Sequence, residues 1–293
     1  MTIFYKVADH LFRLILPDDS PLCRKLSQYE PFKAEEDGEP VFTVEVVGSV
    51  QSPACELVYG GSSDPAQPLV KLYKGEKGWM FEVAPYGTAP IAAKVVSDSG
   101  FNSAKVEILN PKSALFGLNN ALMLMFAFRT ASLGTLELHA SVIVNRGRAF
   151  LWMAASGTGK STHSGLWLKY VEGSSLLNDD NPIVRVFPDG SVVVYGSPWS
   201  GKTPCYKNEH YPLGAFVRIR RCSENNISRL SVFEAYALLY SSSSGFKGDP
   251  LMAARLHESF ELLATSSPCY VLDCRPDEDA ARVSSSELLA LYE

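Results

Sequence analysis

The chain has 293 residues, 46% of them hydrophobic and 20% charged, which is typical of a soluble globular protein with one large or two modest domains. Its formal net charge of −5 comes without a basic stripe, which argues against a nucleic-acid-binding protein. The six cysteines have no CxxC spacing, and the N-terminus lacks a basic start followed by an apolar core. We therefore expect reduced thiols, no zinc finger, no secretion signal and a cytoplasmic location.

Residues 1–132 predict a β-rich region that ends in a linking helix. Strand-like apolar and β-branched runs lie at residues 11–16, 41–47, 69–73 and 79–83. The apolar run at residues 114–128 is short for a membrane span and contains polar residues, so we expect a buried helix and no membrane partner. We find no cluster of catalytic residue types in this region.

Residues 133–293 predict a second domain, organised around a glycine-rich loop. Residues 136–144 and 149–153 predict a β-hairpin, and its second strand leads into Ala154-Ala-Ser-Gly-Thr-Gly-Lys-Ser-Thr162. Apolar residues at helical spacing follow at positions 163–171. A phosphate-binding loop requires this order of strand, loop and helix, because loop N–H groups and a helix N-terminus converge on the phosphate.

Each residue type in this loop has a chemical role in phosphate binding. Gly157 and Gly159 leave room for close approach, Lys160 supplies positive charge, and the Ser161 hydroxyl can bind Mg²⁺. The residues predicted to bind the nucleotide are Ala154, Ser156, Gly157, Thr158, Gly159, Lys160, Ser161 and Thr162.

A second stretch, Gly196-Ser-Pro-Trp-Ser-Gly-Lys-Thr203, matches the formal pattern better, because Ala154 stands where the first loop would have glycine. Prolines at positions 204 and 212 follow it without an apolar helical stripe, so a helix there would end almost at once. We therefore assign residues 154–162 as the phosphate-binding loop and the second stretch as a chance match or a substrate loop. Its Lys202 could contact phosphate or acceptor, or lie on the surface.

Two adjacent carboxylates, Asp179 and Asp180, follow a short apolar run about twenty residues after the loop lysine. This pattern indicates a buried strand that delivers an acidic pair to the loop. Adjacent side chains on a strand point to opposite faces, so only one of the pair can face a given metal unless the strand ends there. The alternative is a turn, for which Asp-Asp-Asn-Pro is suitable chemistry.

His139 becomes a candidate because the predicted hairpin places it beside the loop. A structural role at the end of an apolar strand is the alternative. The remaining elements predict an α/β fold with a mixed sheet: a hairpin at 183–195, a strand at 215–220, a helix opening with the capping box of Ser231 and Glu234, a helix at 251–264, a strand at 269–273 and a helix after Asp277.

Three motifs in order, Leu138-His-Ala-Ser141, Ala154-Ala-Ser-Gly-Thr-Gly-Lys-Ser161 and Leu176-Leu-Asn-Asp-Asp180, resemble the C-terminal catalytic domain of HPr kinase/phosphorylase. They are similar also to the kinase core of ATP-dependent phosphoenolpyruvate carboxykinase. The resemblance covers about residues 136–203. It implies a P-loop nucleotide domain with a mixed sheet at 133–293.

The resemblance also implies an ATP-dependent phosphotransferase and a role for each matching residue. Lys160 would hold the β- and γ-phosphates, and Ser161, Asp179 and Asp180 would hold Mg²⁺. Asp180 would be the base on an acceptor hydroxyl. His139 would orient that carboxylate or bind a second metal.

The resemblance thus implies a kinase that transfers the γ-phosphoryl group of ATP to a hydroxyl, in the first place a serine on a protein or peptide, with a small molecule as another acceptor. Residues 196–204 differ from the corresponding segment of HPr kinases, which favours an acceptor other than HPr. Two alternatives remain open: a regulatory ATP-binding module whose N-terminal region binds a partner, and a small carboxykinase-like enzyme using Arg218 and Arg220. The sequence also leaves homo-oligomer formation open.

Overall fold

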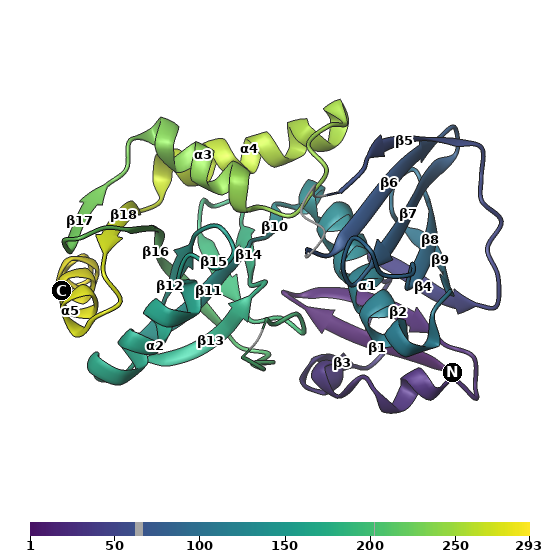
Figure 1. Ribbon diagram of the computed structural model, residues 1–293, viewed down its shortest axis with the longest axis horizontal. Coiled ribbons are helices and arrows are strands. Elements are labelled where there is room, and N and C mark those ends of the chain that lie inside the picture. The colour runs from purple at the N-terminus through teal and green to yellow at the C-terminus, as the bar shows by residue number, and fades with distance from the viewer. Residues whose placement is uncertain (62–66, 202) are drawn as a thin grey trace. The chain divides into compact units, whose positions relative to one another are not determined.

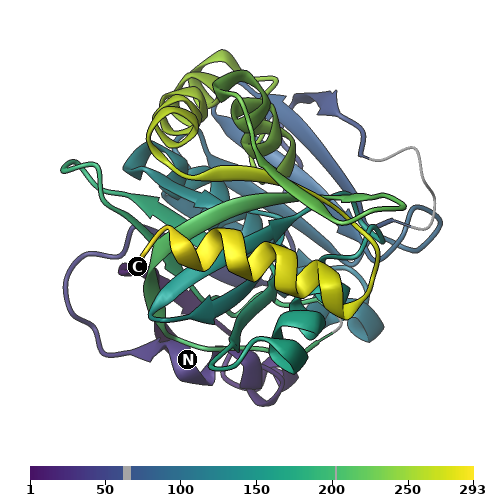
Figure 2. The ribbon, with the colours of Figure 1, turned by 90° about the vertical axis from the view of Figure 1, so that its left-hand side faces the viewer.

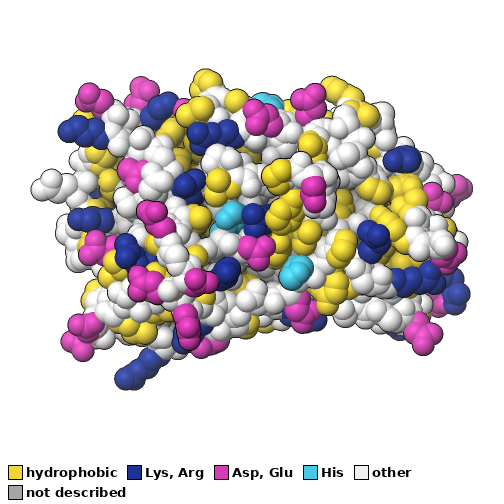
Figure 3. Space-filling model, turned by 180° about the vertical axis from the view of Figure 1, so that it is seen from behind, with side chains coloured by type: hydrophobic (Ala, Val, Ile, Leu, Met, Phe, Trp, Pro, Cys, Tyr) yellow, Lys and Arg dark blue, Asp and Glu magenta, His cyan; other side chains and the backbone are white. Residues whose placement is uncertain are grey.

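The computed structural model of the chain describes residues 1–61, 67–201 and 203–293. The chain divides into two compact units, Met1–Thr130 and Ala131–Glu293, each of which contains a mixed sheet and helices (Figure 1). The protein is therefore mixed α/β. On the face seen in Figure 3, lysine and arginine side chains are interspersed with aspartate and glutamate side chains.

The first unit is built on a nine-stranded sheet in the order β3-β1-β2-β4-β9-β8-β7-β6-β5. The β2–β4 and β4–β9 pairs are parallel and the other pairs are antiparallel. The four runs predicted as strands here are confirmed as β2, β4, β6 and β7. The strand bounds are β1 Thr2–Val7, β2 His10–Ile15, β3 Lys33–Ala34, β4 Phe42–Val47, β5 Cys55–Tyr59, β6 Leu69–Gly75, β7 Gly78–Ala84, β8 Ala93–Asp98 and β9 Ser103–Ile108.

Helix α1, Ala114–Thr130, follows the short 3-10 turn Pro111–Ser113 and packs on β4, β7, β8 and β9. The segment Pro111–Leu133 is long and apolar enough to cross a membrane by length and composition alone, but 61% of its most apolar window is buried in the structure. Gly117 is required at the contact with the sheet, because a Cβ there would meet the Ala93 methyl at 2.8 Å. The helix is thus mostly buried, as the sequence predicted.

The second unit is also built on a mixed sheet, in the order β10-β14-β15-β16-β12-β11-β13, with β18 beside β16 and β17 beside β18. The β12–β16 and β16–β18 pairs are parallel, so these three strands end at the same edge. The strand bounds are β10 Thr135–Glu137, β11 Ala140–Asn145, β12 Arg148–Met153, β13 Ser175–Asp180, β14 Ile183–Val186, β15 Val192–Tyr195, β16 His210–Arg221, β17 Asn226–Arg229 and β18 Cys269–Cys274.

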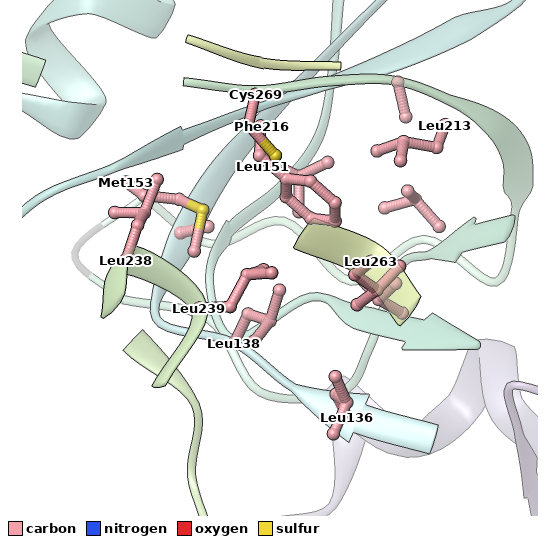
Figure 4. Packing of buried hydrophobic residues seen from close by; sticks show 14 of the residues in the cluster. Leu136, Leu138, Leu151, Met153, Leu213, Phe216, Leu238, Leu239, Leu263 and Cys269 are labelled. Atoms are coloured by element: carbon pink, nitrogen blue, oxygen red, sulfur yellow. The ribbon is translucent and has the colours of Figure 1, made fainter. Parts of the chain in front are cut away.

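Helices cover both faces of this sheet. Strand residues alternate between faces, so Leu151 and Met153 pack with α3 (Val232–Ser242) and α4 (Pro250–Ser266), as Figure 4 shows. Phe150 and Trp152 face the other way and pack with α2 (Lys160–Tyr170) and α5 (Glu278–Ala290), which crosses the strands in Figure 2. The expected helices and the mixed sheet are confirmed, including the capping box that begins α3.

One predicted strand is wrong in its continuity. Residues 136–144 were expected to form a single strand, but β10 pairs with β14 while β11 pairs with β12 and β13. Leu138 and His139 lie in the break, where Leu138 bridges to Ser243 and the His139 N–H donates to the Ser242 carbonyl at 2.7 Å. An apolar run has the same residue pattern whether its two halves pair with the same strand or with different strands, so the pattern does not predict the break.

Candidate active site

The glycine-rich loop, residues 154–159, leaves the carboxyl end of β12 and leads directly into α2. In open α/β sheets, ligands bind at the carboxyl ends of parallel strands, so this edge is where a site is expected. Gly157 has φ 76° and Gly159 has φ 133°, values that L side chains rarely adopt. The strand, loop and helix order that the sequence predicted is confirmed, and no helix follows residue 203 before β16.

Arg221, at the end of β16, holds the loop from outside. Its Nε donates to the Thr158 carbonyl at 2.9 Å and its Nη2 to the Gly157 carbonyl at 2.5 Å. Ala154, which replaces the usual glycine, is not among the non-glycine residues with positive φ. The backbone here therefore does not require glycine, and Ala154 is compatible with the loop.

Lys160, the first residue of α2, is only 8% exposed, and its Nζ donates to the Ala154 carbonyl at 3.2 Å. The Lys160 side chain thus reaches back across the loop to its first residue. Burial lowers the pKa of Lys160, while the negative charges of Asp180 and Asp179 oppose that shift. The Lys160 ammonium is therefore close enough to both carboxylates to interact with their charges.

Ser161 and Asp179 are joined by a hydrogen bond, in which Ser161 Oγ donates to Asp179 Oδ1 at 2.8 Å. Asp179 is 3% exposed. A hydroxyl beside a carboxylate is the hard-oxygen chemistry that Mg²⁺ prefers, and Mg²⁺ commonly takes one or two carboxylates plus phosphate oxygens. No group of three or more His, Cys, Asp and Glu side chains arranged for a metal occurs in residues 1–61, 67–201 and 203–293, so these oxygens provide a partial set of ligands.

Asp180 is the last residue of β13 and has φ 136°, in a region that favours glycine. Non-glycine residues in such conformations are strained and cluster at functional sites. Side chains alternate between the two faces of a strand, which would turn Asp180 away from the face of Asp179. Because β13 ends at Asp180, this alternation does not fix the direction of its side chain. Its Oδ1 lies 3.6 Å from His139 Nε2.

The loop at residues 196–201 supports the acidic strand end. Asn178 is fully buried and its Nδ2 donates to Ser197 Oγ and to the Trp199 carbonyl, each at 3.1 Å. The Gly201 N–H donates to the Asp179 carbonyl at 2.5 Å. Residues 196–201 therefore brace β13 rather than form a second strand-loop-helix site, and Lys202 lies outside the described residues.

His139 is half-buried in the break between β10 and β11. Burial lowers its pKa, the positive charge of Lys160 acts in the same direction, and Asp180 opposes both. A neutral imidazole beside a carboxylate can orient that carboxylate by a hydrogen bond from a ring N–H. The structure brings together His139, Asp180, Lys160, Ser161 and Asp179 at the loop.

The sequence analysis missed Glu137, a carboxyl that is 1% exposed at the end of β10. Ser244 Oγ donates to its Oε1 at 3.0 Å, while its Oε2 is buried with no hydrogen-bond partner among the described residues. Burial raises the pKa of Glu137 to about 8, and the charge of Asp180 adds to the shift. A glutamate inside an apolar strand was the available signal.

Two cavities flank the loop on opposite sides of the sheet edge. One, of about 500 Å³, is lined by residues that include Gly157, Gly159, Leu166, Ile219, Arg221 and Pro276. The other, of about 630 Å³, which we call the serine cavity, is lined by residues that include His139, Arg218 and the ranges 154–156 and 241–244. Alternation along β16 separates them, because Ile219 and Arg221 face one side and Arg218 the other.

Arg218 and Arg220, the arginines of the carboxykinase-like alternative, lie near the carboxyl end of β16. At Arg218 the strand has β12 on one side and β18 on the other, whereas Arg220 lies beyond the last β12 pair and is beside β18 alone. Alternation along the strand places both arginines on one face. Arg220 forms a two-bond ion pair with Asp273, at 2.7 and 2.6 Å. Arg218 instead lines the serine cavity.

No family model matches the chain, and no curated protein matches it. A solved structure of the HPr(Ser) kinase/phosphatase from Coxiella burnetii is similar over 54% of this chain and 99% of that chain, with 8% sequence identity and a TM-score of 0.32. At this distance the likeness supports neither a family nor an activity.

Proposed function

We propose that the protein is an ATP-dependent phosphotransferase that moves the γ-phosphoryl group of ATP to a hydroxyl, in the first place a serine hydroxyl of a protein or peptide in the cytoplasm. The observation that carries this proposal is the cluster at the carboxyl end of β12. There Lys160 and the hydrogen-bonded pair of Ser161 and Asp179 lie beside the strained Asp180. Phosphoryl transfer requires mainly charge neutralisation and positioning, and this cluster offers both.

The loop N–H groups and the N-terminus of α2 receive the phosphates in this proposal. The Lys160 amine, which now donates to the Ala154 carbonyl, would exchange that partner for the β- and γ-phosphate oxygens. Ser161, Asp179 and Asp180 would hold Mg²⁺, which supplies neutralisation of the phosphate charge when bound. The nucleoside would lie in the cavity beside Gly157 and Arg221.

Asp180 then acts as the base. The acceptor oxygen forms a bond to the γ-phosphorus as the bond from that phosphorus to the β,γ-bridging oxygen breaks, and ADP leaves. The acceptor proton passes to the Asp180 carboxylate, which His139 orients from 3.6 Å. The strained backbone of Asp180 fits this role, because strained residues cluster at functional sites.

The test is Mg²⁺-dependent release of ADP from ATP, measured with binding of ATP, for the wild type, Asp180→Asn and Lys160→Ala. Asp180→Asn is expected to bind ATP within a few-fold of wild type and to lose turnover by about 10²–10⁴-fold, as removal of a general base does. Lys160→Ala is expected to lose binding as well. Arg220→Ala is the matched control, because that side chain is paired with Asp273.

If Asp180→Asn releases ADP as fast as the wild type, the base assignment is wrong. If the wild type binds ATP but does not turn it over with any acceptor, the protein is a nucleotide-binding module instead.

A further inference from the structure

The serine cavity lies on the side of the loop where the proposed base is. His139 lines it, and His139 Nε2 is 3.6 Å from Asp180 Oδ1. An acceptor hydroxyl must reach that carboxylate and the γ-phosphate together, so it must enter from this side. A volume of about 630 Å³ is in the range of small-molecule and side-chain sites.

The wall of this cavity is fixed in place. The Ser244 N–H donates to the Glu137 carbonyl at 2.9 Å, and the His139 N–H donates to the Ser242 carbonyl. The buried Glu137 carboxyl also accepts from Ser244 Oγ. The serine run at 241–244 is therefore held against β10 as a preformed surface.

One polar atom on a residue that lines this cavity, Ser243 Oγ, is buried without a hydrogen-bond partner among the described residues, and Ser243 is only 7% exposed. His139 Nε2 makes no hydrogen bond there either, but it faces the Asp180 carboxylate at 3.6 Å. Buried polar atoms normally have partners, and those left without one point to a ligand or to water. This observation is independent of the shape of the cavity.

Arg218 gives the cavity its charge. Of the three arginines near the end of β16, Arg220 is paired with Asp273 and Arg221 donates to the loop carbonyls, whereas Arg218 lines the cavity. An arginine fork matches a carboxylate or phosphate in geometry and charge. The acid near Arg218 is Glu234 on α3. Hydrogen bonds from Ser231 lower the pKa of Glu234, and the positive charge of Arg218 adds a smaller effect in the same direction.

We propose that the serine cavity binds the phosphoryl acceptor, and that Arg218 selects acceptors with a carboxylate or phosphate group close to the reacting hydroxyl. This inference rests on the proposed function. The acceptor O–H donates its proton to Asp180 as its oxygen takes the phosphoryl group, while the anionic group meets Arg218 and the hydroxyls of the serine run contact the polar remainder. A free hydroxy acid and a serine with an acidic neighbour in a peptide share this chemistry.

The test compares matched acceptors with Mg²⁺ and ATP. Glycerate and glycerol differ in charge, and so do two short peptides in which the serine is followed by aspartate or by asparagine. The wild type is expected to prefer the anionic member of at least one pair by about tenfold in kcat/KM, the size of one charge-assisted contact. Preference within the first pair alone identifies a small-molecule acceptor, and preference within the second a peptide.

Arg218→Ala is expected to lower kcat/KM for the anionic member of the pair about tenfold more than for the neutral member, so that the preference disappears, and Arg218→Lys to restore part of it. Arg220→Ala, on the same strand and face, is expected to keep the wild-type ratio. If Arg218→Ala slows both members of a pair equally, Arg218 acts on the transferred phosphoryl group and the selection is refuted. Transfer to none of the four probes, or equal transfer within each pair, overturns the inference while ATP binding stands. Failure of the wild type to bind ATP refutes the proposed function itself.

Discussion

The backbone of Asp180 provides a prediction that separates stability from function. Its φ of 136° is in a region where a side chain costs about 1–3 kcal/mol and glycine does not. Glycine adds about 0.5–1 kcal/mol of backbone entropy loss on folding, so Asp180→Gly should stabilise the second unit by about 1 kcal/mol. For a domain of this size that is a rise in Tm of about 2–4 °C.

Asp180→Ala is the matched control, because it also removes the carboxylate and its pair with His139 but keeps the strained Cβ. Loss of that pair should matter little, since both side chains are partly exposed. Thermal unfolding followed by circular dichroism measures the difference between the two variants, and turnover of ATP should be lost in both. If the glycine variant melts at or below the alanine variant, Asp180 is not strained and the argument from its backbone fails.

Three further predictions follow from buried groups and from the loop. Because burial raises the pKa of Glu137 to about 8 from the usual 4.5, the folded state keeps a proton that the unfolded state loses, so stability should fall as pH rises between these values. Glu137→Gln should flatten that part of the stability profile in urea unfolding, and an unchanged slope would contradict it. Asn178→Ala should cost about 2–4 kcal/mol in the same assay, because it removes three hydrogen bonds of a buried amide, two donated to Ser197 Oγ and the Trp199 carbonyl and one accepted from the Asn181 N–H; a loss under 0.5 kcal/mol would refute this role. Arg221→Ala should weaken ATP binding several-fold by calorimetry with Tm nearly unchanged, since the side chain is exposed but holds two loop carbonyls, and unaltered affinity would argue against it.

Local patterns predicted most of the elements of the second unit. The glycine loop at 154–159, the capping box of Ser231 and the strand that ends in Asp180 each carry their signal within a few residues, and the structure has an element at each place. The break at His139 could not be predicted in this way. It arises because β10 and β11 pair with different strands, and pairing partners are set by contacts far apart in sequence.

The same distinction applies to the candidate site. Residue types and spacing single out Lys160, Ser161 and Asp180, whereas Glu137 is recognised only when its burial is known, and Arg218 is distinguished from Arg220 only when the cavity wall is known. Arg218 and Arg220 are equivalent in sequence, two residues apart on one strand. Only the position of Asp273 on the neighbouring β18 shows that Arg220 already has a partner.

The measurement that tests the central claim most directly is calorimetric binding of ATP with Mg²⁺ to the wild type, Lys160→Ala and Lys202→Ala. We predict that the wild type binds, that Lys160→Ala abolishes binding, and that Lys202→Ala leaves affinity near wild type. Loss of binding in Lys202→Ala alone would place the nucleotide at the other loop, and a wild type that binds no ATP would contradict the account.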